Sequence, residues 1–203
     1  PDFVAPSNST FSTVATIPIT AFTYTVRGFF VFDCIPQPGG APGLDPVSEW
    51  PMQRFAYRRF GDHEALVGNF TVDAGSDRAG IRWFELRNTG TGYSLHQEGT
   101  LAPADGLNRF MGSIAMDEAG DIALGYSVSS SSVFPSIRYS TRTPSDPPGT
   151  LQAEQTMKTG GGSQTSTSSR WGDYSAMSVD PANCCDFWFT TEYYGATSQN
   201  QWK

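Results

Sequence analysis

Residues 109–126, RFMGSIAMDEAGDIALGY, hold two short apolar stretches separated by an acidic turn that contains a glycine. Asp117 is a residue type that opens turns, and Gly120 can adopt the positive φ that many turns require. The second stretch, residues 122–126, is apolar throughout, which is typical of a strand buried on both faces. We therefore predict two strands joined by a turn, with no helix in this part of the chain.

The same pattern begins at Arg59, Arg109 and Arg170. Each copy reads arginine, an aromatic residue, a start that contains glycine, a short apolar strand, a turn with Asp, and an aromatic strand. The arginines are 50 and 61 residues apart, and a four-stranded propeller blade takes about 40–50 residues. The units expected from this spacing are 1–58 (partial), 59–108, 109–169 and 170–203 (incomplete).

The composition fits an all-β fold. The chain has 21 Gly, 14 Pro and 13% aromatic residues, which supply tight turns and side chains suited to a pleated sheet. We expect antiparallel four-stranded blades that make up about half of a β-propeller ring. A β-sandwich is the alternative, since it also has many short strands, but it gives no reason for the recurring arginine motif.

Further elements follow from local patterns. Residues 82–87 and 93–97 flank the turn sequence NTGTG at 88–92, which predicts a hairpin. Short strands are also expected at 12–17, 23–32 and 137–140.

Charge and hydropathy exclude several partners. The net charge is −7 and only two of the thirteen cationic residues are lysines, so no basic stripe is available for nucleic acid. No apolar run reaches the roughly 18 residues of a membrane span. The chain begins with Pro1 instead of Met, which we interpret as processing or as a fragment of a longer protein.

Cys34, Cys184 and Cys185 are the three cysteines. A strained bridge between the two adjacent cysteines, a bridge from one of them to Cys34, and a simple buried thiol all remain open. A zinc site is not expected, because no C-x-x-C spacing is present.

Five phrases carry a resemblance to large secreted bacterial proteins with a C-terminal propeller-like region. They are CIPQPG (34–39), YRRFGDHE (57–64), GIRWFELR (80–87), MGSIAMD (111–117) and RWGDYSAMSVDP (170–181). The general architecture is similar to that of sialidase-like propellers, although the Asp-box turn of that family is not present in full. The resemblance implies an extracellular or cell-surface protein.

The three repeated arginines are the first candidate site. If Arg59, Arg109 and Arg170 gathered at one mouth of the ring, their paired N–H donors would bind a carboxylate, a sulfate or an acidic sugar. Sialidase-like enzymes use an arginine triad in this way. The alternative is that each arginine braces its own blade by pairing with a neighbouring carboxylate.

Other candidates lie beside these arginines. Asp62 and Asp173 hold equivalent positions and could bind Ca²⁺ together with backbone carbonyls; no other cofactor is expected. His63, next to Asp62, could act as an acid or base. Tyr174 and Glu192 are similar to the Tyr/Glu nucleophile pair of a sialidase. A platform that stacks on sugars could be formed by five aromatic residues, which could instead fill the space between blades: Trp83, Trp171, Trp188, Tyr193 and Tyr194.

Two functions compete. The first is a binding or assembly module without a complete catalytic site, whose partner is a protein, a glycan or another copy paired through open strand edges. The second is a carbohydrate-active enzyme, a hydrolase or a lyase, that acts on acidic glycans.

Overall fold

The computed structural model describes residues 4–9 and 16–203. These residues form an all-β structure without an α-helix. The strands are β1 (Pro51–Arg59), β2 (Glu64–Asp73), β3 (Ala79–Asn88), β4 (Tyr93–Leu101), β5 (Asn108–Met116), β6 (Ile122–Ser129), β7 (Ser136–Arg142), β8 (Gln155–Lys158), β9 (Ala176–Val179) and β10 (Phe187–Thr190). Two 3₁₀ helices, Pro6–Asn8 and Pro38–Gly40, complete the regular structure. No helix in the described ranges is long and apolar enough to cross a membrane.

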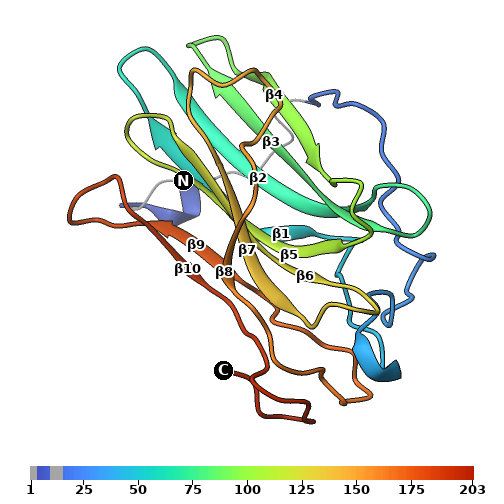
Figure 1. Ribbon diagram of the computed structural model, residues 1–203. Coiled ribbons are helices and arrows are strands. Elements are labelled where there is room, and N and C mark those ends of the chain that lie inside the picture. Colours follow the sequence, from blue (N-terminus) through green and yellow to red (C-terminus); the bar gives the residue numbers. More distant parts are fainter. Residues whose placement is uncertain (1–3, 10–15) are drawn as a thin grey trace.

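The strands form two four-stranded antiparallel sheets and a hairpin (Figure 1). Sheet 1 has the order β1–β2–β3–β4, sheet 2 has the order β5–β6–β7–β8, and β9 pairs with β10. Within each sheet and within the hairpin, each strand therefore pairs with the next one in the sequence. The turn between β3 and β4 shows the local cause, because the side-chain oxygen of Asn88 accepts hydrogen bonds from the N–H groups of Gly90 and Gly92. The predicted hairpin at this turn is confirmed.

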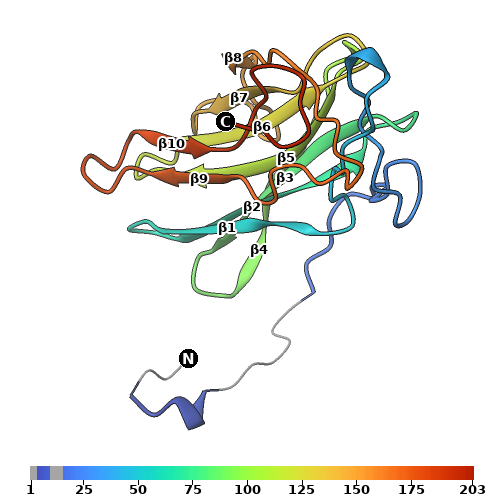
Figure 2. The same ribbon diagram turned by 90° about the horizontal axis from the view of Figure 1, so that it is seen from below.

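Sheet 2 packs on sheet 1 with one face and on the hairpin with the other, so the chain builds three layers. Figure 2 shows the two sheets and the hairpin from a second direction. On one face, Ile114 and Leu124 pack with Val67 of sheet 1. On the other face, Ala115 and Ala123 pack with Met177 of β9. Every residue of β6 is buried, which confirms that residues 122–126 form a strand covered on both sides.

The hairpin approaches sheet 2 closely because Gly125 has no side chain. A Cβ at this position would lie 2.7 Å from the ring of Phe189. Nearby, the indole N–H of Trp171 donates to the hydroxyl of Ser127 over 3.0 Å. Small residues on the back of sheet 2 therefore allow the third layer to dock.

The first strands of the three layers are neighbours, since β5 contacts both β1 and β9. Four-stranded sheets in sequential order, with adjacent first strands, are what a propeller predicts. Two antiparallel sheets packed face to face also occur in sandwiches. The described structure is consistent with both arrangements.

The N-terminal part differs from the expectation. The predicted strand at 12–17 lies mostly outside the described residues, which omit 10–15. The predicted strand at 23–32 is wrong, because only Thr23 forms a bridge, with Asp73. Several residues of this segment adopt positive φ, and such residues interrupt an extended strand.

The repeated arginines do not hold equivalent places in the sheets. Arg59 is the last residue of β1, whereas Arg109 is the second residue of β5. Arg170 precedes β9. The expected unit from 59 to 108 therefore begins after the first strand of sheet 1, whereas the unit from 109 to 169 contains almost all of sheet 2.

The three cysteines are free thiols. Cys34 is buried and its Sγ lies 3.1 Å from the carbonyl oxygen of Val26. Burial raises the pKa of this thiol to about 12. Cys184 and Cys185 lie in the turn between β9 and β10.

Candidate functional site

The seven candidate residues occupy three separate places. Arg59, Asp62 and His63 line a cavity at the turn between β1 and β2. Arg170, Asp173 and Tyr174 line a cavity beside the start of β9. Arg109 is fully buried.

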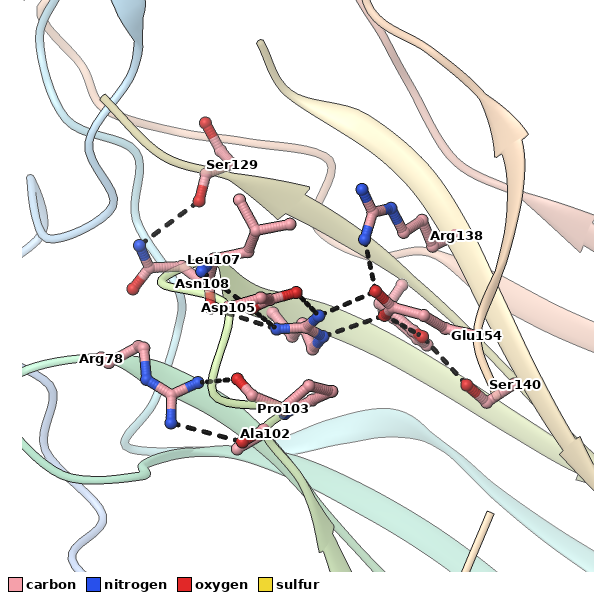
Figure 3. Close-up of polar contacts among 12 residues, drawn as sticks. Arg78, Ala102, Pro103, Asp105, Leu107, Asn108, Ser129, Arg138, Ser140 and Glu154 are labelled. Atoms are coloured by element: carbon pink, nitrogen blue, oxygen red, sulfur yellow. Dashed lines mark hydrogen bonds and ion pairs between the residues drawn. The ribbon is translucent and has the colours of Figure 1, made fainter. Parts of the chain in front are cut away.

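Arg109 is held by two carboxylates inside the sheet packing (Figure 3). Its guanidinium donates to both oxygens of Asp105, over 3.0 and 2.6 Å. It also donates to both oxygens of Glu154, over 3.0 and 2.8 Å. Glu154 accepts further bonds from Arg138 and from the hydroxyl of Tyr126. These contacts fix the loop before β5 and the segment before β8 to the middle of sheet 2.

The hydrogen bonds of this network favour the charged forms of Arg109, Asp105 and Glu154. Burial disfavours the charged guanidinium of Arg109, but the bonds to Asp105 and Glu154 outweigh it and raise its pKa. The bond from Arg109 lowers the pKa of Asp105 to about 2. Burial opposes the charge of Glu154, yet hydrogen bonds from Arg109 and Tyr126 hold its pKa below the usual value. A buried group with its donors fully used has no N–H left for a ligand, so this arginine acts as a brace.

The loop that supplies Asp105 is itself fixed (Figure 3). Arg78 donates to the carbonyl oxygens of Pro103, over 2.7 Å, and Ala102, over 3.3 Å. Asp105 accepts the N–H of Leu107 over 3.0 Å. The carboxylate is therefore presented to Arg109 by a preorganised loop.

The cavity at the β1–β2 turn has a volume of about 330 Å³. His63 stacks on Phe60, with ring centroids 4.6 Å apart, and its Nδ1 lies 2.7 Å from Oδ1 of Asp62. This bond lowers the pKa of Asp62. The other ring nitrogen, Nε2, is buried and has no hydrogen-bond partner among the described residues. A substrate cannot reach that nitrogen in this conformation, so the dyad lacks the access that acid or base catalysis requires.

The arginine cluster does not form. Arg58 donates to the carbonyl oxygen of Met116 over 3.1 Å, so the end of β1 lies beside the end of β5. Arg109 is seven residues from Met116, which corresponds to roughly 20 Å along a strand. Arg59 and Arg109 are thus at opposite ends of their strands, and the three guanidinium groups do not converge.

The cavity beside β9 is larger and more varied in chemistry. It has a volume of about 490 Å³ and is lined by aromatic, amide, hydroxyl and charged side chains. Besides Arg170, Asp173 and Tyr174, its lining includes Glu192 and Trp202. We call it the C-terminal cavity. Trp202 is 62% exposed and Tyr174 is also exposed, so both aromatic faces are available for stacking.

Buried anchors hold the loop that carries these residues. Trp171 is buried, stacks with Tyr194 and contacts Phe110 of β5. The hydroxyl of Ser175 donates to the carbonyl oxygen of Met111 over 2.7 Å. Met111 lies at an irregularity in β5 and has a φ of 51°, and such bulges often redirect groups beside functional sites. The residues between these anchors are thereby directed into the cavity.

Two short paired segments form another part of the lining. Tyr194 bridges to Trp202, and Tyr193 exchanges two backbone hydrogen bonds with Lys203, over 3.0 and 2.8 Å. This pairing holds Trp202 in the lining of the same cavity as Arg170. The sequence reasoning missed Trp202 and Lys203 as site residues. Aromatic residues on both sides of the polar stretch 195–201 were the signal that could have indicated a hairpin.

Two carboxylates in the C-terminal cavity have different surroundings. Asp173 forms a two-pronged ion pair with Arg170, whose side chain is mostly exposed. Burial raises the pKa of Glu192; the Gly172 N–H opposes this and the charge of Asp173 adds to it. Glu192 and Tyr174, predicted as a pair, both line this cavity.

No shared calcium site exists at the two aligned aspartates, because Asp62 and Asp173 line different cavities. In the part of the chain that the structure describes, no group of three or more His, Cys, Asp or Glu side chains could hold a metal ion. Comparison with protein-family models, with curated proteins and with solved structures finds no match to this chain.

Proposed function

We propose that the chain is a binding module of a secreted or cell-surface β-propeller and that its C-terminal cavity takes a glycan. One observation carries this proposal: the exposed rings of Tyr174 and Trp202 line the same cavity as the Arg170–Asp173 pair. Aromatic faces pack against the apolar C–H faces of sugars, and guanidinium, carboxylate and amide groups bond to sugar hydroxyls. A volume of about 490 Å³ suits one or two sugar units.

An acidic sugar is the preferred ligand class. Arg170 is exposed and its pKa is raised by Asp173, so it carries its charge at all ordinary pH values. Lys203 adds a second cation to the lining. A carboxylate on the ligand would gain charge-assisted hydrogen bonds that a neutral sugar lacks.

The propeller assignment and the extracellular location belong to the same proposal. Sequential four-stranded sheets with adjacent first strands support propeller blades. The resemblance to secreted bacterial proteins with sialidase-like architecture supports a location outside the cell.

Binding is tested with two probes, trigalacturonate as an acidic glycan and xylohexaose as a neutral one. Trp202→Ala is compared with Trp188→Ala by isothermal titration calorimetry. Trp188 is the matched control, because it is 63% exposed on β10 and is not part of the cavity lining. We expect trigalacturonate to bind more tightly than xylohexaose, and Trp202→Ala to weaken binding at least tenfold with Trp188→Ala unchanged. Absence of binding to either probe, or equal effects of the two variants, contradicts the proposal.

A second candidate, glycoside hydrolysis, is favoured by the two carboxylates. Glycoside hydrolases use a pair of carboxyl groups, one of them an acid with a raised pKa; burial raises the pKa of Glu192, and Asp173 lines the same cavity. If the cavity is catalytic, the wild-type chain releases reducing ends from polygalacturonate, and Glu192→Gln stops release while binding persists. If the wild-type chain binds trigalacturonate without any release, the binding module remains.

A further inference from the structure

One face of sheet 1 is apolar but is only partly covered by described residues. Registers place Phe55, Gly68 and Phe84 side by side, as well as Tyr57, Leu66 and Leu86. These residues point away from sheet 2, because their neighbours Val67 and Ile81 pack against it. We call this the front face of sheet 1. A sheet face directed to water is normally polar, so this face has the composition of a buried one.

Exposed apolar side chains are concentrated here. Six of the fourteen large exposed hydrophobic side chains found among the described residues lie on β1, at Trp50 or in residues 19–24. The segment from residue 17 to 24 crosses the face: Phe22 contacts the ring of Phe70, and Thr20 bonds to Glu98 and Arg82. Between this segment, Trp50 and the strands lies a groove of about 420 Å³. The segment therefore covers the β3–β4 side and leaves Phe55 and Tyr57 open.

The repeat shows that the counterpart of this face in sheet 2 is buried. The third strands of the two sheets share the sequence Ile-Arg-aromatic, at 81–83 and 137–139. In each sheet the arginine pairs with a glutamate at the fourth strand, Arg82 with Glu98 and Arg138 with Glu154. In sheet 2 this arginine lies on the face that packs on sheet 1, since Arg138 pairs in register with Tyr126 of the shared core. The front face of sheet 1 is thus the counterpart of a face that packs on another sheet.

Area and charge point to a second copy as the occupant. Six half-exposed side chains on and beside the face, most of them aromatic and each about 150–250 Å² in full, offer roughly 600 Å². Specific protein interfaces bury about 600–1,000 Å² per partner. The rim carries both signs, with Arg54 and Arg59 on β1 and Glu49 and Glu64 nearby. A rim of mixed sign can complement itself across a two-fold axis.

We propose that two copies of this chain associate through the front face of sheet 1, with Phe55 and Tyr57 of each copy at the centre of the contact. This contact uses a sheet face, in contrast to pairing through open strand edges. It is independent of the C-terminal cavity, which lies next to the hairpin in the third layer.

Sedimentation velocity over a hundredfold range of concentration tests the proposal. We expect the wild-type chain to approach twice its 22.0 kDa as concentration rises. Phe55→Lys is compared with Met157→Lys, whose native side chains are 51% and 49% exposed. We expect Phe55→Lys to raise the dimer dissociation constant at least tenfold, while Met157→Lys and Trp202→Ala leave it unchanged. A thermal melt identifies a variant that fails to fold.

Hydrogen exchange of the unmodified chain gives a second readout that needs no variant. Peptides that cover residues 17–24 and 50–57 should become protected at high concentration, and those that cover 155–158 should not. A wild-type chain that stays monomeric at all concentrations overturns the proposal. So does a chain that binds phosphatidylcholine vesicles through Phe55 but does not self-associate.

Discussion

Arg109 and Arg170 start the same sequence motif but have opposite surroundings. Arg109 has no exposed surface and is neutralised by Asp105 and Glu154. Arg170 is mostly exposed and pairs with Asp173 at the edge of a cavity. The difference shows that a repeated residue type does not carry a repeated role. Its role depends on whether the next layer covers it, and sheet 2 is covered on both faces.

The largest expected effect comes from removing the covered arginine. Arg109→Met leaves Asp105 and Glu154 without their cation, and loss of one partner of a buried ion pair costs about 3–5 kcal/mol. Arg170→Met removes a mostly exposed cation from Asp173, whose own side chain is 9% exposed, and we expect this partly screened pair to be worth about 1 kcal/mol. Urea unfolding of the two variants measures the contrast. Equal losses in the free energy of unfolding would mean that the burial of Arg109 does not make its ion pairs more stabilising than that of Arg170.

A smaller effect is expected where the hairpin docks on sheet 2. Gly125→Ala places a Cβ 2.7 Å from the ring of Phe189, and such overpacking costs about 1–3 kcal/mol. Gly61→Ala is the control, since a Cβ there meets open space. Urea unfolding should show the loss for Gly125→Ala alone, and Phe189→Leu should recover part of it. An unchanged free energy of unfolding for Gly125→Ala would mean that the third layer is not docked as described.

The sequence was sufficient for the sheets where turn chemistry and apolar runs agree. The turn at Asn88 and the buried strand at 122–126 are local patterns, and both are confirmed. The first strand of sheet 1 was harder to find, because residues 51–59 mix polar and aromatic side chains that face partly to solvent. Because that strand was not predicted, the sequence motif assigned Arg59 and Arg109 equivalent positions. In the structure they lie at opposite ends of their strands.

The candidate site was predictable only in part, because long-range contacts create its cavity. Arg170, Asp173, Tyr174 and Glu192 were identified from motif and residue type, and they line one cavity. What orients the loop that carries them is the bond from Trp171 to Ser127, a residue 44 positions away. No local sequence pattern indicates such a distant partner. The same holds for Arg109, whose carboxylate partner Glu154 is 45 residues away.

Stability in acid should depend differently on Asp105 and on Asp121. The pKa of Asp105 is about 2 in the folded chain against about 3.9 when unfolded. The contribution of Asp105 to the free energy of unfolding is therefore present above pH 4 and is lost as the pH falls towards 2. Because this carboxylate is partly exposed, we expect on the order of 1 kcal/mol. Asp105→Asn should lower stability at pH 7 and flatten the loss between pH 4 and 2.

Asp121 is the control, because its pKa is shifted in the opposite direction to that of Asp105. Burial and the charge of Asp117 raise its pKa, so its ionised form weakens the folded state and protonation strengthens it. Asp121→Asn should therefore not reduce stability at pH 7. If Asp121→Asn lowers stability as much as Asp105→Asn does, the difference between the two carboxylates is not electrostatic. Urea unfolding at pH 7, 4 and 2 gives the comparison.

The smallest effect on folding is expected at Arg170, and it sharpens the contrast with Arg109 most directly. Arg170→Gln should change the free energy of unfolding by less than about 1 kcal/mol, because the side chain of Arg170 is mostly exposed and the pair is partly screened by solvent. The same variant should weaken trigalacturonate binding about tenfold or more, since it removes the cation that meets the ligand's carboxylate. Calorimetric titration at low and high salt measures this loss, and the wild-type affinity should fall with salt while that of the variant falls less. A variant that loses stability but keeps its affinity would assign Arg170 the bracing role of Arg109.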